Sequence, residues 1–185
     1  MRKIIASLNI TLDGYCDHTA GVADEELHDH YTSLLNNAGA LLYGKTTYQL
    51  MENFWPLLVK NPSGDKSMDD FAVAIENVPK IVFSRTLTNV DGWKNVTLAT
   101  RSLEEEISIL RKQTGKDVFL GSPGLIAAAT RLNLVDEYQL CIHPVILGSG
   151  LPLFKNITDR RVLKLLKTKT FGSGVILASY EPAKN

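Results

Sequence analysis

Four short segments of this sequence combine small, hydroxyl-bearing and cationic residues in patterns suited to binding phosphate groups. In the first, Gly121-Ser122-Pro123-Gly124 follows the apolar run Asp117–Leu120 and precedes the Ala-rich run Leu125–Leu132. This order predicts a strand, a tight turn and a helix, with the proline in the first helical turn, where its missing N–H costs nothing. The first N–H groups of such a helix have no partner inside it, and the helix dipole adds about half a positive charge there. A phosphate could lie on these amides. A turn without a ligand explains the same residues, and the full G-x-G-x-x-G spacing is absent.

The other three segments each follow a strand-like apolar run as well. They are Leu12-Asp13-Gly14, Gly44-Lys45-Thr46-Thr47 and Ser84-Arg85-Thr86. Lys45 and Arg85 have hydroxyl groups beside them, and charge-assisted hydrogen bonds from such side chains are the usual way to hold a phosphate. In an open parallel sheet, ligands bind outside the carboxyl ends of the strands. Four such segments at one edge predict an extended polyphosphate ligand such as a dinucleotide. The alternative is that each segment is a turn or cap, with both cations in solvent.

These segments need a sheet whose strands end at a common edge, and the order of the elements predicts one. Apolar, β-rich runs predict strands at residues 3–11, 40–43, 80–83, 96–99, 117–120 and 137–143. Helical spacing and capping residues predict helices at residues 44–51, 68–77, 102–113 and 125–132, and one that begins after Asp24. Phe54-Trp55-Pro56 is expected to end the helix that starts at residue 44. Residues 162–171 and 175–180 flank Gly172-Ser173-Gly174 and predict a terminal antiparallel hairpin.

Strands that alternate with helices predict an α/β fold with a mainly parallel sheet and helices on both faces. The 185 residues are enough for one domain, which we assign to residues 1–185. The apolar content of 44%, the charged content of 22% and the net charge of zero give no reason to expect nucleic acid or an acidic membrane surface as a partner. No apolar run approaches the ~20 residues that span a bilayer.

The positions of the cysteines and histidines bear on disulfide formation and metal binding. Cys16 and Cys141 form no C-x-x-C motif, and no signal peptide is visible, so we expect two reduced thiols in a cytoplasmic protein. The four histidines include one i, i+2 pair, which does not share a helix face, and no carboxylate or cysteine cluster completes a metal site. We therefore expect no bound metal.

Two acidic residues are candidates for acid–base chemistry. Glu26 lies with other acids at the start of the first predicted helix and could exchange a proton with a substrate. Acids are also favoured at a helix N-terminus because of the helix dipole alone. Asp13 follows the first predicted strand, where it could either act in catalysis or cap the loop. For both residues, a purely structural role is the alternative to a role in catalysis.

Several segments, in this order, resemble those of the dihydrofolate-reductase-like proteins. Ser7–Tyr15 resembles the "SLDGY/F" opening of that superfamily, and Tyr43–Tyr48 resembles its "GRKTYE" segment. Leu134–Phe154 is similar to "LVDEL…HPVVLGGGxxLF", and Phe171–Val175 is similar to the turn of the terminal hairpin. More narrowly, the chain resembles the C-terminal reductase domain (RibD) of the bifunctional riboflavin-biosynthesis deaminase/reductase. The resemblance covers nearly the whole chain.

The resemblance implies a dihydrofolate-reductase-like three-layer α/β/α sandwich, a homodimer, and NADPH as hydride donor. The dimer contacts would come from the strand at residues 137–142 and the terminal hairpin. The implied cofactor-binding residues fall into three groups. The nicotinamide would contact Ala6, Ser7 and the Asp13-Gly14 loop. The adenosine ribose and its 2′-phosphate would contact Ser84 and Arg85. The pyrophosphate would contact Gly121, Ser122, Gly124 and Leu125, and both the pyrophosphate and the adenosine side would contact Gly44, Lys45, Thr46 and Thr47.

Two positions depart from the family pattern. Gly121-Ser122 stands where the family usually has Gly-Gly, and Lys45 stands where the family often has Arg, whose bidentate fork Lys cannot form. The implied function is NADPH-dependent reduction of a small heterocycle, closest to 5-amino-6-(5-phosphoribosylamino)uracil reductase activity. The alternatives are a dihydrofolate or other pterin reductase and a nucleotide-binding homodimer without catalysis.

Overall fold

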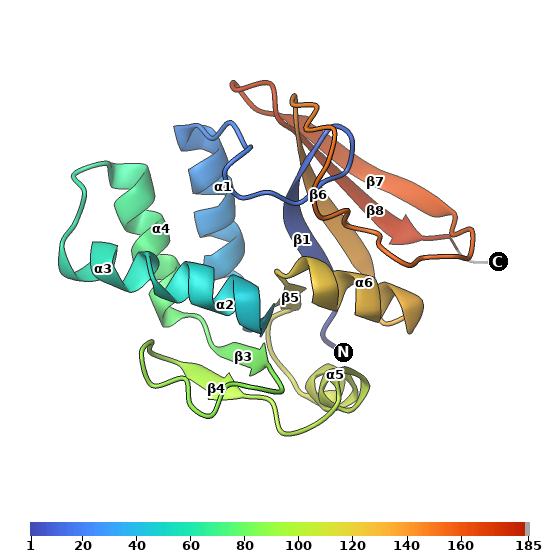
Figure 1. Cartoon of the computed structure of the whole chain (residues 1–185), viewed down its shortest axis with the longest axis horizontal. Helices are drawn as coiled ribbons and strands as arrows, with labels where there is room; N and C mark the ends of the chain where they lie inside the picture. The colour runs from blue at the N-terminus through green and yellow to red at the C-terminus, as the bar shows by residue number, and fades with distance from the viewer. Residues whose placement is uncertain (184–185) are drawn as a thin grey trace.

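Eight strands form a single sheet in the computed structural model, which describes residues 1–183 (Figure 1). In chain order the strands are β1 (Ile4–Thr11), β2 (Ala40–Gly44), β3 (Lys80–Phe83), β4 (Val96–Leu98), β5 (Val118–Leu120), β6 (Glu137–His143), β7 (Leu163–Thr170) and β8 (Ile176–Pro182). Their order across the sheet is β4-β3-β2-β5-β1-β6-β8-β7. The first six strands pair in parallel, and β7 and β8 add an antiparallel hairpin. The predicted α/β class and terminal hairpin are confirmed.

Helices cover both faces of this sheet. They are α1 (Glu25–Asn36), α2 (Lys45–Glu52), α3 (Trp55–Lys60), α4 (Lys66–Asn77), α5 (Leu103–Lys112) and α6 (Pro123–Arg131). Ile4 and Ala6 of β1 belong to the core cluster that includes residues of α5 and α6, whereas Ile5 belongs to the cluster with residues of α1 and α4. Figure 1 shows α1 to α4 grouped on one side of β1. Within residues 1–183 no helix has the length and apolar character that crossing a bilayer would require.

The segment after α2 differs from its sequence-based prediction. Helix α2 ends at Glu52, just before Phe54-Trp55-Pro56 as expected, but Trp55 then begins a further helix, α3, that was not predicted. The proline falls within the first turn of α3, where a missing N–H is harmless. The ring of Trp55 packs against Phe71 of α4 with the ring centroids 4.3 Å apart. This aromatic contact gives α3 a packing partner that local sequence does not reveal.

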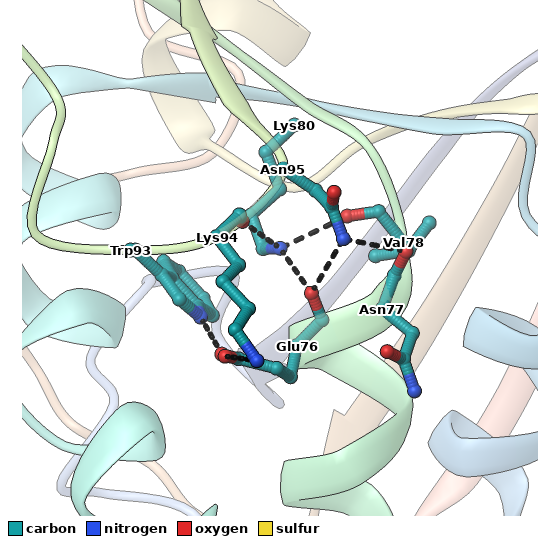
Figure 2. A network of polar contacts seen from close by, with 7 residues as sticks. All are labelled: Glu76, Asn77, Val78, Lys80, Trp93, Lys94 and Asn95. Atoms are coloured by element: carbon teal, nitrogen blue, oxygen red, sulfur yellow. Dashed lines mark hydrogen bonds and ion pairs between the residues drawn. The ribbon is translucent and has the colours of Figure 1, made fainter.

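The connection between β3 and β4 contains no helix and is held by a buried lysine (Figure 2). Lys80, at the start of β3, is only 1% exposed. Its Nζ donates hydrogen bonds to the carbonyl oxygens of Glu76 (3.2 Å), Val78 (2.9 Å) and Lys94 (3.2 Å). The ammonium also lies 4.3 Å from the ring centroid of Trp93. Burial lowers the pKa of Lys80 to about 8.

This network joins three separate pieces of chain. Lys80 satisfies carbonyl groups at the end of α4, where a helix leaves its last carbonyls unpaired. Asn95 donates from its side chain to the carbonyls of Glu76 and Asn77, and it has a left-handed φ of 56° that asparagine tolerates well. Residues 93–95 are therefore fixed at the amino edge of the sheet, whereas the same connection begins at residue 84, at the carboxyl end of β3.

Candidate functional site

The four segments predicted to share an edge of the sheet do share it. They follow β1, β2, β3 and β5, which are neighbours in the order β3-β2-β5-β1 and are all parallel. We call this edge the carboxyl rim and define it as residues 12–14, 44–47, 84–86 and 121–124. The parallel pairing brings together segments that are far apart in the sequence.

Side-chain hydrogen bonds connect the segments of the carboxyl rim. Ser122 is buried, and its hydroxyl accepts a hydrogen bond of 2.9 Å from the backbone N–H of Gly44. Lys45 reaches from the start of α2 to Thr86, where its Nζ donates to the hydroxyl oxygen at 2.8 Å. Three of the four segments are thus joined before any ligand binds. The hydroxyl of Ser122, predicted to contact pyrophosphate, has a protein partner.

The two helices that start at the carboxyl rim have no side-chain caps, unlike most other helices of the chain. Side chains of Asp24, Asp65 and Ser102 accept hydrogen bonds from the first amides of α1, α4 and α5. Helices α2 and α6 begin without such a bond, although Ser122 is a residue type that often caps its own helix. The first N–H groups of both helices therefore remain available to an anion at this edge.

The two glycines of the turn after β5 lie in different surroundings. A Cβ atom added to Gly121 would lie 2.6 Å from Cε1 of Tyr43, so this glycine lets β2 and β5 approach closely. A Cβ added to Gly124 would meet nothing within 4 Å. The start of α6 therefore faces open space at Gly124, as a binding site for a phosphate requires.

Most of the other predicted cofactor-binding residues lie at or near the surface of the carboxyl rim. Thr46 and Arg85 are exposed, and Thr47, Ser84 and Leu125 are half-buried. Within residues 1–183, the guanidinium of Arg85 forms no ion pair. Ala6 differs from the rest, because it is 0% exposed in the core beneath α5 and α6. Its side chain therefore does not reach the surface where a nicotinamide could bind.

The candidate acid Asp13 connects two loops through hydrogen bonds to its carboxylate. Its carboxylate accepts hydrogen bonds from the hydroxyl of Thr11 (2.6 Å) and from the amides of Leu147 (3.1 Å) and Gly148 (2.8 Å). These bonds, led by that from Thr11, lower the pKa of Asp13. The neighbouring Gly14 has a φ of +85°, a conformation that favours glycine. The carboxylate thus has the loop-forming role that was the alternative to catalysis.

The candidate acid Glu26 lies against the terminal hairpin. Its carboxylate pairs with Lys169 at 2.9 Å and accepts a hydrogen bond of 3.1 Å from the amide of Gly172. The Lys169 interaction, followed by the Gly172 amide, lowers the pKa of Glu26. Both candidate acids therefore have structural partners in the chain itself.

The structure also leaves part of β1 without a strand partner on one side, which sequence reasoning missed. Strand β5 pairs only with Ile4–Ala6 of β1, whereas β6 pairs with β1 as far as Thr11. The carboxyl half of β1 consequently has no strand neighbour on the β5 side. On the face toward α1, Ser7 and Thr11 are buried but Asn9 between them is exposed. A polar Asn inside an otherwise apolar run was the one sequence signal for this position.

Tyr31 of α1 contacts this exposed asparagine. Its hydroxyl donates a hydrogen bond of 2.8 Å to Oδ1 of Asn9. Burial raises the pKa of Tyr31 well above its ordinary value, so the hydroxyl keeps its proton. Cys141 lies beside it on β6, where burial raises the pKa of the thiol to about 11. The carboxyl rim and the carboxyl half of β1 together offer helix amides available to an anion, two cations and one exposed amide side chain.

Comparison with known sequences gives one family and two relatives that align with this chain over nearly their full length. The family model described as RibD C-terminal domain matches residues 2–177. YyaP of Bacillus subtilis strain 168, described as an uncharacterized protein, is 36% identical over 183 residues, which are 97% of this chain and 94% of that protein. YwjB of the same organism, also described as uncharacterized, is 24% identical over 183 residues, covering 95% of this chain and 96% of that protein.

Solved structures share the fold at lower identity. A putative riboflavin biosynthesis protein from Shewanella sp. PV-4 has a TM-score of 0.75 at 19% identity, with 98% of this chain and 99% of that chain covered. A diaminohydroxyphosphoribosylaminopyrimidine deaminase/5-amino-6-(5-phosphoribosylamino)uracil reductase from Thermotoga maritima has a TM-score of 0.66 at 19% identity. That match covers 98% of this chain but 57% of the Thermotoga chain, so it concerns one part of a larger protein.

Proposed function

Because the chain belongs to the RibD C-terminal domain family, we propose that it is an NADPH-dependent reductase of a small heterocycle. The nearest named reaction is reduction of 5-amino-6-(5-phosphoribosylamino)uracil, the activity in the name of the Thermotoga protein. The single observation that carries this proposal is the pair of uncapped helix starts, α2 and α6, at one edge of the sheet. Nucleotides in open α/β sheets bind at such an edge.

The residues of the carboxyl rim fit a dinucleotide with a 2′-phosphate. The amides at the starts of α2 and α6 would hold the pyrophosphate, with Gly124 leaving room for it. Ser84 and Arg85 would bind the adenosine ribose and its 2′-phosphate, since a guanidinium matches phosphate geometry. NADPH would supply the hydride. The chain would position the nicotinamide beside the carboxyl half of β1, where β5 has ended.

A thermal-shift titration with NADPH and NADH tests this assignment. A ligand at a hundred times its Kd should add about 2.7 kcal/mol to the free energy of unfolding. We expect NADPH to stabilise the protein more than NADH and expect Arg85→Ala to remove that difference. The matched control is Arg160→Ala, an exposed arginine in the connection before β7, at the opposite edge. No stabilisation by either nucleotide at millimolar concentration would overturn the proposal.

One observation favours a second candidate, a nucleotide-binding homodimer without catalysis. Asp13 and Glu26 are both held in structural contacts, which leaves neither carboxylate free as proton donor. Steady-state oxidation of NADPH decides between the two functions. The substrates to compare are an aminouracil and dihydrofolate, because a pterin reductase is the remaining enzymatic alternative. Turnover with either compound excludes the non-catalytic candidate.

We also propose a homodimer formed through the terminal hairpin and a cytoplasmic location. Strand β6 lies between β1 and β8 and offers no free edge, so the hairpin alone carries this proposal. Strand β7 is an edge strand, and the hairpin with the residue before it exposes Val162, Leu165, Leu166 and Ile176. The location rests on Cys16 and Cys141, which are free thiols as expected in a reducing compartment.

A further inference from the structure

A segment between β1 and α1, residues 17–23, is attached to the rest of the fold at a single point. We call this segment the strap. Most of it is exposed, and it forms hydrogen bonds within itself, as from Thr19 to Asp17. Within residues 1–183, one hydrogen bond joins the strap to another element: the amide of Val22 donates to Nδ1 of His143 at 3.0 Å. The attachment of the strap therefore depends on one imidazole nitrogen.

The backbone of the strap also packs on the imidazole ring itself. A Cβ atom added to Gly21 would lie 3.1 Å from Cε1 and 3.3 Å from Nδ1 of His143. His143 is the last residue of β6 and is 2% exposed, although the strap beside it lies at the surface. Thr11, its partner in register on β1, is equally buried. The strap therefore covers an imidazole at the carboxyl end of the sheet.

The hydrogen bond from Val22 fixes which nitrogen of His143 carries the proton. Because Nδ1 accepts this bond, the neutral ring has its proton on Nε2. Nε2 is buried and has no hydrogen-bond partner in the described part of the chain. Uptake of a second proton would turn Nδ1 into a donor that faces the donating amide of Val22. The bond that holds the strap therefore exists only with the neutral ring.

The charged and titratable groups on the elements around His143 do not bond to its ring. His143 forms no ion pair among residues 1–183. Cys141 on β6 and Tyr31 on α1 stay neutral because burial raises their pKa values. The other such groups are Asp13 after β1, Asp17 and His18 in the strap, Asp24, Glu25, Glu26 and His30 at or near the start of α1, and Lys169 on β7.

Most of the carboxylates in this set already have partners. Asp13, Asp17, Asp24 and Glu26 all accept hydrogen bonds from other groups, and Glu26 is also paired with a lysine. Burial lowers the pKa of His143, since a charged ring beneath the strap would be cut off from water. The charged ring and the closed strap are therefore incompatible.

We propose that the strap is an acid-released element, held closed by the neutral imidazole of His143 and freed when that ring takes up a proton. Opening gives both the imidazolium and the amide of Val22 access to water. In the open form, the ring titrates near the ordinary pKa of histidine, about 6.5. The closed form is therefore favoured above this pH, and opening increases as the pH falls through it. The inference does not depend on the proposed function.

Solvent exchange of the Val22 amide, measured by NMR on the full chain, tests the release. It is expressed as a protection factor, which removes the pH dependence of exchange itself. From pH 7.5 to pH 5.5 we expect this factor to fall about fivefold to tenfold, because tenfold is the limit for a ring that titrates near 6.5 when open and stays neutral when closed. The amide of Leu153 is the reference, since its acceptor, the carbonyl of Gly14, does not titrate.

Two variants assign the effect to the right histidine. His143→Asn keeps an oxygen acceptor near the position of Nδ1 but cannot titrate, so the Val22 amide should have the same protection factor at both pH values. His18→Asn removes the exposed histidine of the strap itself and is the matched control. It should show the full wild-type decrease. Imidazole ¹H–¹⁵N spectra of the wild type at pH 7.5 should show the proton of His143 on Nε2.

The results that would overturn the inference are distinct. A Val22 protection factor that is equal at pH 7.5 and pH 5.5 overturns it, and so does an equal decrease in His143→Asn. A proton on Nδ1 at pH 7.5 overturns it as well, because that tautomer cannot accept the bond from Val22. A parallel loss of protection at Leu140 in β6 would mean that the whole fold opens, which contradicts a local release. The NADPH titration tests the proposed function separately.

Discussion

Gly121 and Gly124 lie in the same turn but have different structural roles. Gly121 lies against the buried ring of Tyr43, and Gly124 faces open space at the start of α6. The first glycine allows two strands to approach, and the second keeps the helix amides accessible. Replacing each by alanine therefore separates packing from binding within four residues of chain.

Gly121→Ala should destabilise the fold. The new Cβ would lie 2.6 Å from the Tyr43 ring, which is enclosed between β2 and the helices and cannot move away easily. Overpacking of this kind costs about 1–3 kcal/mol. Urea unfolding of the variant beside the wild type measures the loss. Unchanged stability would mean that the turn and ring separate more readily than the structure indicates.

Gly124→Ala should stabilise the protein but weaken NADPH binding. Alanine is favoured over glycine within a helix by up to about 1 kcal/mol, and the added methyl group contacts nothing. The same methyl group would occupy the space expected for the pyrophosphate. Unfolding and NADPH titration are measured on the same preparation. Tight NADPH binding by this variant would place the pyrophosphate elsewhere.

His143 should make stability depend on pH between about 7 and 5. This residue is 2% exposed, and its Nδ1 accepts a hydrogen bond of 3.0 Å from the amide of Val22. Burial lowers the pKa of His143 below its value in the unfolded chain. The unfolded state therefore binds more protons in this window, so the free energy of unfolding falls as the pH decreases.

A variant isolates the contribution of His143 to that pH dependence. His143→Asn keeps an oxygen acceptor near the position of Nδ1 but cannot titrate. We expect a shallower decline in its free energy of unfolding between pH 7 and pH 5, measured by urea unfolding at several pH values. His30, whose pKa is lowered by burial and then by Lys169 and Lys167, should account for part of the decline that remains. Identical pH profiles for variant and wild type would exclude His143 as a source.

At the scale of elements, α4, β3 and the connection after β3 meet at the ammonium of Lys80. Lys80→Met would leave the carbonyl oxygens of Val78 and Lys94 without this donor, at a cost of about 1–3 kcal/mol each. Burial lowers the pKa of Lys80 from 10.5 to about 8, which means that keeping the charge buried costs free energy. Replacing the lysine removes this cost and stabilises the folded protein by roughly 3 kcal/mol at neutral pH. The two effects nearly cancel, so we expect a small change in stability at pH 7.

The pH profile of Lys80→Met is the sharper prediction. In the wild type, the unfolded chain binds more protons than the folded chain between pH 8 and 10.5, so Lys80 adds to the free energy of unfolding as the pH rises through this window. The methionine variant should lack that contribution. Urea unfolding from pH 7 to pH 10 measures it, and an unchanged rise in the variant would contradict the role assigned to Lys80.

Elements with local signals were predictable, and those that depend on distant contacts were not. The helix predicted from residue 102 onward is present as α5, and Ser102 with Glu105 forms a capping box at its start with both hydrogen bonds made. Helix α3 was missed because Pro56, read from the local sequence, indicates the end of a helix. The ring that packs against Trp55 belongs to Phe71, which lies on α4 and is distant in the sequence. The strand ends of the carboxyl rim were predicted correctly because each had its own small or cationic residues.

At the scale of the whole molecule, strand order is what the sequence could not supply. The carboxyl half of β1 lacks a strand neighbour on one side because β5 is short and pairs with only three residues of β1. Nothing near residue 9 in the sequence indicates where residues 118–120 will end. Asn9 was accordingly missed, whereas Ala6, taken from the resemblance, proved to lie in the core.

The exposed apolar residues of the hairpin should hold two chains together. We expect light scattering coupled to size-exclusion chromatography to give twice the chain mass, and Leu165→Glu with Leu166→Glu to give the single chain mass. Leu57→Glu, at an exposed leucine of α3, is the control and should remain dimeric. The lysines of β7 disfavour direct pairing of two β7 edge strands. A wild-type protein that is monomeric at all concentrations would refute the dimer.

The position of β1 also affects how the chain is made. Strand β1 leaves the ribosome before its two partners in the finished sheet, β5 and β6, which come from residues 118–120 and 137–143. At about 5–20 residues per second, roughly 6 to 25 seconds pass before those partners emerge. During that time an apolar strand has no permanent neighbour. Nascent chains of this protein should therefore depend on chaperones until β6 has emerged, and refolding from denaturant should be slow, as nonlocal strand pairing requires.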